Sequence, residues 1–313
     1  TASTATACNN SPTLCNRAYG NVTLLGAHDS AFLRDSSTGN SIAGDQSYNT
    51  VAQLDAGARL LTAQVHSATA ADGTQEWHLC HSYCFLLDAG RLSDWLRNIS
   101  TWMDAHPHEV VTILLVNSDA ASAEDLDSEF VASGVKKYVY TPPSPATASD
   151  AAIPAAKWPT LQQMIAADTR LVTFVASLAN DNTGASYLLD EFTYVYENAY
   201  DNSSPDSFVC TPDRPSTVKG NPDAAAASNR LFLMNHFLYT DLGDSIQVPD
   251  LSAINATNAE SGAGSLGAAV RQCEGVYGRA PLAVLVDFVG DGGSVEVVDR
   301  VNGVVGAVGR AGV

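Results

Sequence analysis

The chain has 313 residues, of which 45% are hydrophobic and only 16% are charged. That apolar share supplies a sizeable core, which excludes a disordered chain and a small domain held by disulfides alone. Acidic residues outnumber basic ones by 34 to 16, giving a formal charge of −18 that disfavours nucleic acid and charge-driven docking on anionic lipid. Apolar runs such as Ile113–Val116 are far shorter than the roughly 20 residues of a membrane span. We expect a soluble protein with no transmembrane segment.

Short stretches rich in apolar and β-branched residues recur along the chain and predict strands, several of them buried on both faces as in a parallel sheet. In chain order they are Val22–Leu25, Arg59–Val65, Glu76–Cys80, Val110–Val116, Arg170–Val175, Thr193–Tyr196, Arg230–Met234 and Leu282–Phe288.

Helical patterns lie between several of these strands. The clearest is Leu92–Ala105, where apolar side chains recur every three or four residues before Pro107. This alternation predicts an α/β fold: a single TIM-type (β/α)8 barrel, regular or distorted, in one domain over residues 1–313, with an open doubly wound sheet as the alternative. The other predicted helices are Tyr48–Ala56, Leu161–Ala167, Leu266–Tyr277 and Val295–Val305, and the long surface loops are Tyr138–Pro159 and Asn198–Ala227.

The cysteines suggest an oxidising compartment. Six cysteines allow 15 pairings, and proximity along the chain favours Cys8–Cys15 and Cys80–Cys84, which leaves Cys210–Cys273. A zinc site at Cys80, Cys84 and the nearby histidines is the alternative, but no second cysteine pair completes it. Asn-X-Ser/Thr triplets and a low lysine content also favour a secreted, extracellular glycoprotein, and we read the chain as already processed at its start. The triplets begin at Asn9, Asn21, Asn98, Asn202 and Asn255.

Polar residues gather where the predicted strands end. In a (β/α)8 barrel these ends form the active site. Each residue alone is more commonly structural, but their convergence on one rim predicts a functional site. The candidates are His28 and Asp29 after the first strand, Gln64 and His66 on one face of the second, His81 after the third, Asn117 after the fourth, and Glu197, Asn235, His236 and Asp287 at the last three.

Several sequence blocks resemble the X domain of phosphatidylinositol-specific phospholipases C, and the middle of the chain is similar to a secreted fungal branch of that superfamily. The blocks are Gly26–Ser30, Gln53–Leu61, His78–Ser82, His108–Leu115 and Val286–Phe288, with Tyr196–Glu197 and Cys210–Pro215 in the middle. The resemblance implies a barrel and phosphodiester chemistry. It also implies that His28 is the general base and His81 the general acid, two roles that imidazoles fill near neutral pH. Asp287 would orient the base and Asp29 would lie beside the phosphate.

The chain departs from the family where a phosphate needs positive charge. In metal-dependent relatives, the positions of Asp29, Thr62, Gln64 and Asn117 supply oxygen ligands, and one carboxylate among four makes a poor calcium site. In metal-independent relatives an arginine stands at Gln64. We therefore expect a cradle of protonated histidines and amides with no required cofactor, and keep a divalent ion as the alternative. The cradle would draw on His28, His81, His66, His236, Gln64, Asn117 and Asn235; the ion would bind Asp29, Glu197 and His236.

These features predict a secreted, monomeric phospholipase C-type phosphodiesterase that acts on phospholipid at a membrane or micelle surface, with a broad headgroup range. The alternatives are a glycerophosphodiesterase or sphingomyelinase-D-like enzyme on the same barrel, and a non-catalytic secreted binding protein. Phe32, Tyr83, Phe85 and Tyr200 lie near the predicted mouth, where they contact either lipid or the core.

Overall fold

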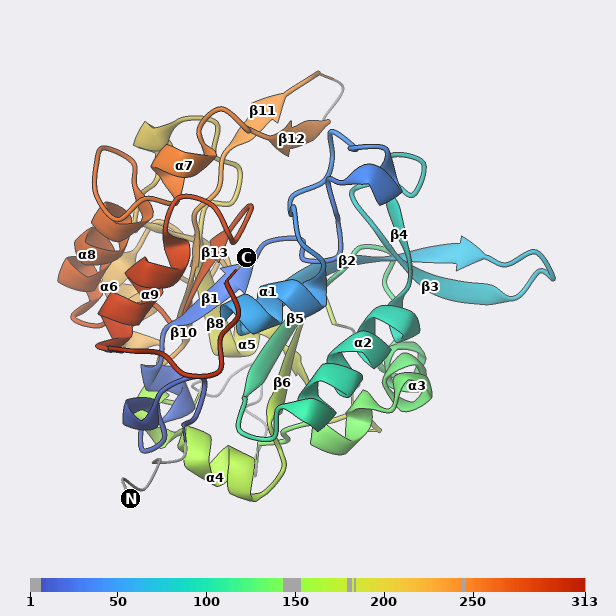
Figure 1. The fold of residues 1–313 in the computed structure, drawn as a ribbon, viewed down its shortest axis with the longest axis horizontal. Helices are drawn as coiled ribbons and strands as arrows, with labels where there is room; N and C mark the ends of the chain where they lie inside the picture. Colours follow the sequence, from blue (N-terminus) through green and yellow to red (C-terminus); the bar gives the residue numbers. More distant parts are fainter. Residues whose placement is uncertain (1–6, 143–152, 179–181, 183, 244–245, 313) are drawn as a thin grey trace.

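A curled, mostly parallel sheet forms the centre of the molecule (Figure 1). The structure is a computed structural model that describes residues 7–142, 153–178, 182, 184–243 and 246–312. Within these residues the parallel strands follow the order β7, β6, β5, β2, β1, β13, β10, β8. Their bounds are β1 Leu24–Ala27, β2 Leu60–Thr69, β5 Val111–Asn117, β6 Leu171–Ala176, β7 Leu188–Asp190, β8 Val195–Asn198, β10 Leu231–Asn235 and β13 Ala283–Val286.

The sheet is a distorted barrel, open on one side. Strands β7 and β8 follow each other directly in the chain through the short helix α5 (Glu191–Tyr194). In the part of the chain that is described they share no ladder, so the run of parallel strands ends at each of them, and β8 pairs on its other edge with the antiparallel strand β9 (Pro212–Arg214). The predicted α/β barrel is therefore confirmed as a half-barrel.

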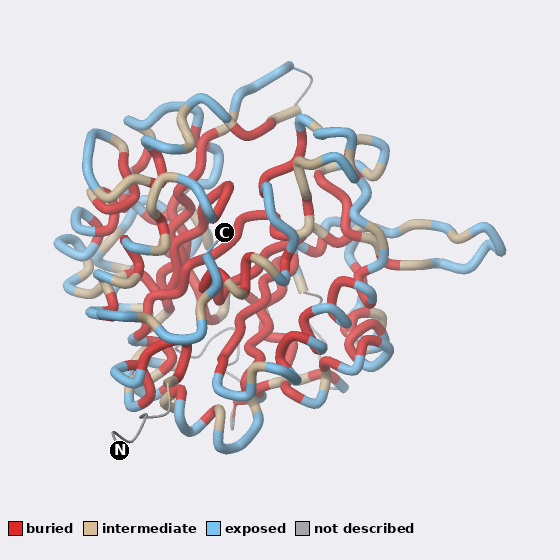
Figure 2. The backbone as a smooth tube through the Cα atoms, in the orientation of Figure 1, coloured by how far each residue is buried: buried red, intermediate tan, exposed pale blue. Residues whose placement is uncertain are grey.

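Helices cover the outside of the curled sheet, as Figure 1 shows, and the strands between them are buried (Figure 2). The predictions at Leu92–Ala105 and Leu266–Tyr277 are confirmed to the residue. The helices are α1 Thr50–Ala56, α2 Leu92–Ala105, α3 Ala123–Ser133, α4 Leu161–Ala166, α6 Pro222–Ala227, α7 Ile254–Thr257, α8 Leu266–Tyr277 and α9 Ser294–Asn302, in addition to α5. No helix in the described ranges is long and apolar enough to cross a membrane.

One predicted strand has a different role from the one expected. Strand β3 (Gln75–Cys80) runs antiparallel to β2 in a projecting hairpin, and β4 (Asp88–Arg91) pairs antiparallel with β3. The cause is the tight turn at Ala70–Thr74, where Gly73 has a φ of +86° and reverses the chain. The remaining parallel strand is the three-residue β7, which was too short to predict.

One buried ion pair and three disulfides hold elements of the fold together. The Arg59 guanidinium donates to Glu109 at 2.9 Å, joining the starts of β2 and β5. Three disulfides occur among the described residues with the predicted pairing, which excludes the zinc alternative at Cys80 and Cys84. They are Cys8–Cys15, Cys80–Cys84 and Cys210–Cys273.

Candidate active site

Three residues at the carboxyl ends of strands, His28, His81 and Asp287, each precede a sharp turn in the backbone. They follow β1, β3 and β13 respectively. In each case the next residue has a positive φ, which is uncommon outside glycine: 45° at Asp29, 56° at Ser82 and 49° at Phe288. The turns place the three side chains at the same end of the sheet.

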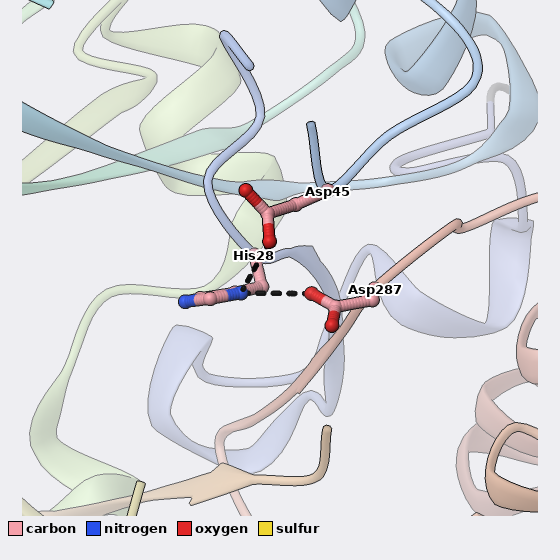
Figure 3. Close-up of side chains that lie close together, drawn as sticks. All are labelled: His28, Asp45 and Asp287. Atoms are coloured by element: carbon pink, nitrogen blue, oxygen red, sulfur yellow. Dashed lines mark hydrogen bonds and ion pairs between the residues drawn. The ribbon is translucent and has the colours of Figure 1, made fainter. Parts of the chain in front are cut away.

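His28 is held from two sides. Its Nδ1 lies 2.8 Å from Oδ1 of Asp287 (Figure 3), and its ring stacks on Phe237 with centroids 3.8 Å apart. Burial by itself lowers the pKa of His28, but the carboxylates of Asp29 and Asp287 outweigh that effect and raise the pKa above its ordinary value. The hydrogen bond at Nδ1 leaves Nε2 as the nitrogen available for proton transfer.

His81 faces the same carboxylate oxygen as His28. Its Nε2 lies 3.8 Å from Oδ2 of Asp29, and Nε2 of His28 lies at the same distance from that atom. Burial lowers the pKa of His81, with Asp29 acting in the opposite direction. The structure thus brings the two predicted imidazoles to one point, with Asp29 common to both.

Gln64 positions Asp29 in this arrangement. Its Nε2 donates to Oδ2 of Asp29 at 2.6 Å, while its Oε1 accepts from the backbone N–H of Ser82 at 2.9 Å. The backbone N–H of Asp29 donates to Oγ1 of Thr62 at 2.8 Å. The predicted amide donor is therefore already engaged, and it ties the loops after β1 and β3 together.

A cavity of about 260 Å³ opens beside these residues. His28, Asp29 and Gln64 line it, whereas His81 is not among its lining residues. A phosphate group in this cavity would contact the His28 imidazole and the Asp29 carboxyl directly.

A second polar group lines the same cavity. Arg214, in β9 (Pro212–Arg214), pairs with Glu197 of the neighbouring β8 at 2.5 Å, and Asn235 donates to the same Glu197 oxygen at 2.9 Å. The ring of Tyr200 lies 4.4 Å from the Arg214 guanidinium. Burial, and then the charge of Glu197, raise the pKa of the adjacent Glu191 well above its ordinary value.

Three predicted site residues lie elsewhere. Asn117 exchanges two hydrogen bonds with the backbone of Ala121 and so holds the turn after β5. His66 lies on the hairpin, 3.4 Å from a carboxylate oxygen of Asp119. The Nε2–H of His236 donates to the backbone carbonyl of Thr257 at 3.0 Å, and burial lowers the pKa of His236 to about 4. None of these three side chains lines the cavity.

The predicted metal set of Asp29, Glu197 and His236 is likewise not brought together. The described residues contain two groups of three side chains whose possible metal-ligand atoms lie within 4.8 Å of one another. Both groups include Asp45, a residue that sequence reasoning missed. Two carboxylates with one imidazole suit a divalent transition-metal ion. Asp45 lies in the loop between β1 and α1, away from any strand end or motif, so no sequence signal pointed to it. The two groups are His28, Asp45 and Asp287, and Asp29, Asp45 and His81.

Sequence reasoning also missed Arg214. The block Cys210–Pro215 drew attention only through the family resemblance, without a role for any residue in it. The guanidinium reaches the cavity because β9 pairs antiparallel with β8, placing Arg214 opposite Glu197. Among the described lining residues it is the only lysine or arginine.

A curled, mostly parallel half-barrel defines a phospholipase C-like fold, and here two imidazoles and a carboxylate lie at the ends of its strands. Comparison with known proteins agrees. The family model described as PI-PLC X 1 matches residues 14–302, and the PI-PLC X domain-containing protein 1 of Arthroderma benhamiae is 36% identical over 297 residues, covering 95% of this chain and 89% of the relative. The chain therefore belongs to the PI-PLC X family.

Further relatives extend the comparison. An uncharacterized secreted protein of Arthroderma benhamiae is 36% identical over 304 residues, which cover 95% of this chain and 64% of that protein. The phosphatidylinositol-specific phospholipase C of Listeria monocytogenes has a TM-score of 0.56 at 17% identity, with 92% of this chain and 95% of that chain covered. The corresponding Staphylococcus aureus enzyme has a TM-score of 0.54 at 14% identity, covering 91% and 94%. At these identities the bacterial structures show the shared fold alone.

Proposed function

We propose that the protein is a phospholipase C-type phosphodiesterase that cleaves the bond between glycerol and phosphate in phospholipids. The observation that carries the proposal is the placement of His28 and His81, whose Nε2 atoms lie 3.8 Å from the same oxygen of Asp29. Two imidazoles at one point can take a proton from an attacking hydroxyl and return one to the leaving oxygen.

His28 is the proposed general base. Its Nε2 takes the proton of the nucleophile, which is a neighbouring headgroup hydroxyl where one exists and water otherwise. Asp287 fixes the tautomer through Nδ1 and stabilises the imidazolium that forms. As the nucleophile bonds to phosphorus, the bond from phosphorus to the glycerol oxygen breaks.

His81 is the proposed general acid. Asp29 lines the cavity and His81 does not, so the proton of His81 reaches the glycerol oxygen through the Asp29 carboxyl. Hydrogen bonds of this kind are often long without substrate and shorten in the reacting complex. Diacylglycerol and a phosphorylated headgroup are the products.

The negative charge on the phosphate is neutralised by the His28 imidazolium, once His28 has taken the proton, and by the Arg214 guanidinium. The amides of Gln64 and Asn235 donate to Asp29 and Glu197, so they support the cradle through those carboxylates. A polar headgroup would find hydrogen-bond donors and acceptors on Glu197, Arg214 and Asn235. These three side chains do not favour a headgroup of one particular charge, which fits a broad headgroup range. No cofactor is required in this scheme.

An exposed aromatic pair follows His81 in the chain and is suited to contact with a lipid surface. Phe85 is 82% exposed and stacks on Tyr83 in the loop that follows His81, whereas Phe32 is buried against the His81 ring. An exposed aromatic pair beside the site is suited to entering an interface. We further propose that the protein acts outside the cell, as the disulfides and the secreted relative suggest, and as a monomer.

A non-catalytic binding protein is the second candidate. It is favoured by one observation: Arg214 is held by Glu197, so part of its charge is already neutralised. Such a protein would bind phosphorylated headgroups in the same cavity without turnover.

Turnover of a chromogenic phosphodiester between about pH 4 and 8 separates these candidates. We expect activity in the parent protein with and without EDTA, loss in His28→Ala and in His81→Ala, and no change in the exposed control His108→Ala. Unchanged turnover in both site variants would reject the two-imidazole mechanism. A parent protein that binds phosphate but shows no turnover, even with added divalent metal, would support the binding protein.

A further inference from the structure

Asp45 is a buried carboxyl group that the mechanism above does not use. Its side chain has no exposed surface. Among the described residues neither carboxyl oxygen has a hydrogen-bond partner, and Nε2 of His81 also lacks one there. Burying polar atoms without partners costs free energy, so this arrangement calls for an explanation.

The two imidazoles lie on either side of the Asp45 carboxyl. Its Oδ2 is 3.3 Å from Nε2 of His81, and its Oδ1 is 4.0 Å from Nδ1 of His28. Figure 3 shows Asp45 and Asp287 approaching the same edge of the His28 ring. Because Asp287 already holds His28 at 2.8 Å, the closer contact of Asp45 is with His81.

The backbone fixes Asp45 in this position. Its N–H donates to the carbonyl of Phe32 at 2.9 Å, and its own carbonyl accepts from Phe288 at 2.9 Å. The next residue, Gln46, donates through Nε2 to the carbonyls of His28 and Val286. The segment is therefore tied to the ends of both β1 and β13, and Asp45 cannot turn toward solvent.

We propose that Asp45 shares one proton with His81 and thereby keeps that imidazole able to donate. The proton rests on Oδ2 of Asp45 or on Nε2 of His81, and no third group is needed to balance it. Asp45 is a positioning residue, since it acts through His81 and does not line the cavity. This inference rests on the proposed function, in which His81 is the acid.

The surrounding charges support this assignment. The titratable groups that face the pair are His28, Asp29, Asp287 and Tyr239, and the ion pairs of Asp45 in the described chain are with histidines only. Burial, Asp287 and Asp29 raise the pKa of Asp45 well above its ordinary value. Burial lowers the pKa of His81, with Asp29 acting in the opposite direction. The Asp45 oxygen 3.3 Å from Nε2 offers the proton of His81 a second site within the pair.

The test is the pH profile of kcat/KM for Asp45→Asn, which keeps the shape of the side chain and removes the exchangeable proton. We expect the limb on the basic side to move to lower pH, with a loss of about tenfold or more at neutral pH and a smaller loss in acid. The matched control is Glu129→Gln, a buried carboxyl distant from the site, for which we expect the parent profile.

Two further arms keep the test decisive. In the His81→Asn background, adding Asp45→Asn should cause no further loss, because Asp45 acts through His81. In the parent protein, nitrogen NMR of the His81 ring should show a proton on Nε2 when phosphate is bound at neutral pH, a measurement that needs no variant.

Three results would overturn the proposal: an unchanged profile in Asp45→Asn, a full additional loss in the double variant, or parent activity that EDTA removes and Mn²⁺ restores. The last would make Asp45 a metal ligand together with Asp29 and His81. Failure of the proposed function is distinct, because the parent protein would then show no turnover at all.

Discussion

Replacing Asp287 by Asn tests how much the orienting carboxylate contributes. The contact of 2.8 Å with His28 is buried and charge-assisted, and such bonds contribute about 1.5–3 kcal/mol. That range corresponds to about 10- to 100-fold in rate. An Asn amide can also donate to Nδ1 and select the wrong tautomer, an effect that reaches about 10⁴-fold in a serine protease triad. We expect kcat to fall by about 10²- to 10⁴-fold, with KM changed far less.

The same variant changes the pH dependence in a defined direction. Asp29 and Asp287 raise the pKa of His28 against the effect of burial, so removing one of these charges lowers it. A general base acts when it is deprotonated, and activity is lost as pH falls through its pKa. The acidic limb of kcat/KM should therefore move to lower pH in Asp287→Asn, measured with a chromogenic phosphodiester. An unchanged limb together with an unchanged kcat would refute the assigned role.

Three further results are expected. Burial lowers the pKa of His236 from 6.5 to about 4, so between these pH values the unfolded chain binds a proton that the folded chain does not. The free energy of unfolding should therefore fall by about 3 kcal/mol as pH drops across that window. Denaturant titrations of His236→Gln should show a smaller fall. Phe85→Ser should weaken sedimentation with phosphatidylcholine vesicles by about tenfold or more, while the exposed control Val305→Ser should not; equal binding would contradict the lipid-facing role. Arg214→Gln, made together with Glu197→Gln so that no carboxylate is left unpaired, should raise KM by about tenfold, and an unchanged KM would place substrate away from this pair.

The local pattern of the sequence determined most of the fold. Apolar spacing located α2 and α8 to the residue, because both helices bury one continuous stripe. The predicted direction of β3 was wrong. An apolar strand pattern does not indicate whether a strand runs parallel or antiparallel to its neighbour, and here the turn at Gly73 sets the direction. Strand β7 has three residues and leaves too short a pattern to detect.

The sequence predicted site residues only where they lie at the end of a strand or within a sequence block that resembles the family. His28 and Asp287 lie close together because the parallel strands β1 and β13 end side by side. His81 reaches the same point from the end of the antiparallel strand β3, which the predicted parallel barrel did not include. Alternation along a strand does not reveal which polar side chains satisfy local backbone groups, as Asn117 does after β5. Asp45 and Arg214 reach the site from a loop and an antiparallel strand, contacts that depend on tertiary packing alone.

The identity of the lipid products tests the central claim most directly. Mixed phospholipid vesicles would be incubated with the parent protein and with His28→Ala, and the released species identified by mass spectrometry. We predict diacylglycerol and phosphorylated headgroups from the parent protein and neither from the variant. Release of phosphatidate or lysophospholipid by the parent, or undiminished diacylglycerol from the variant, would contradict it.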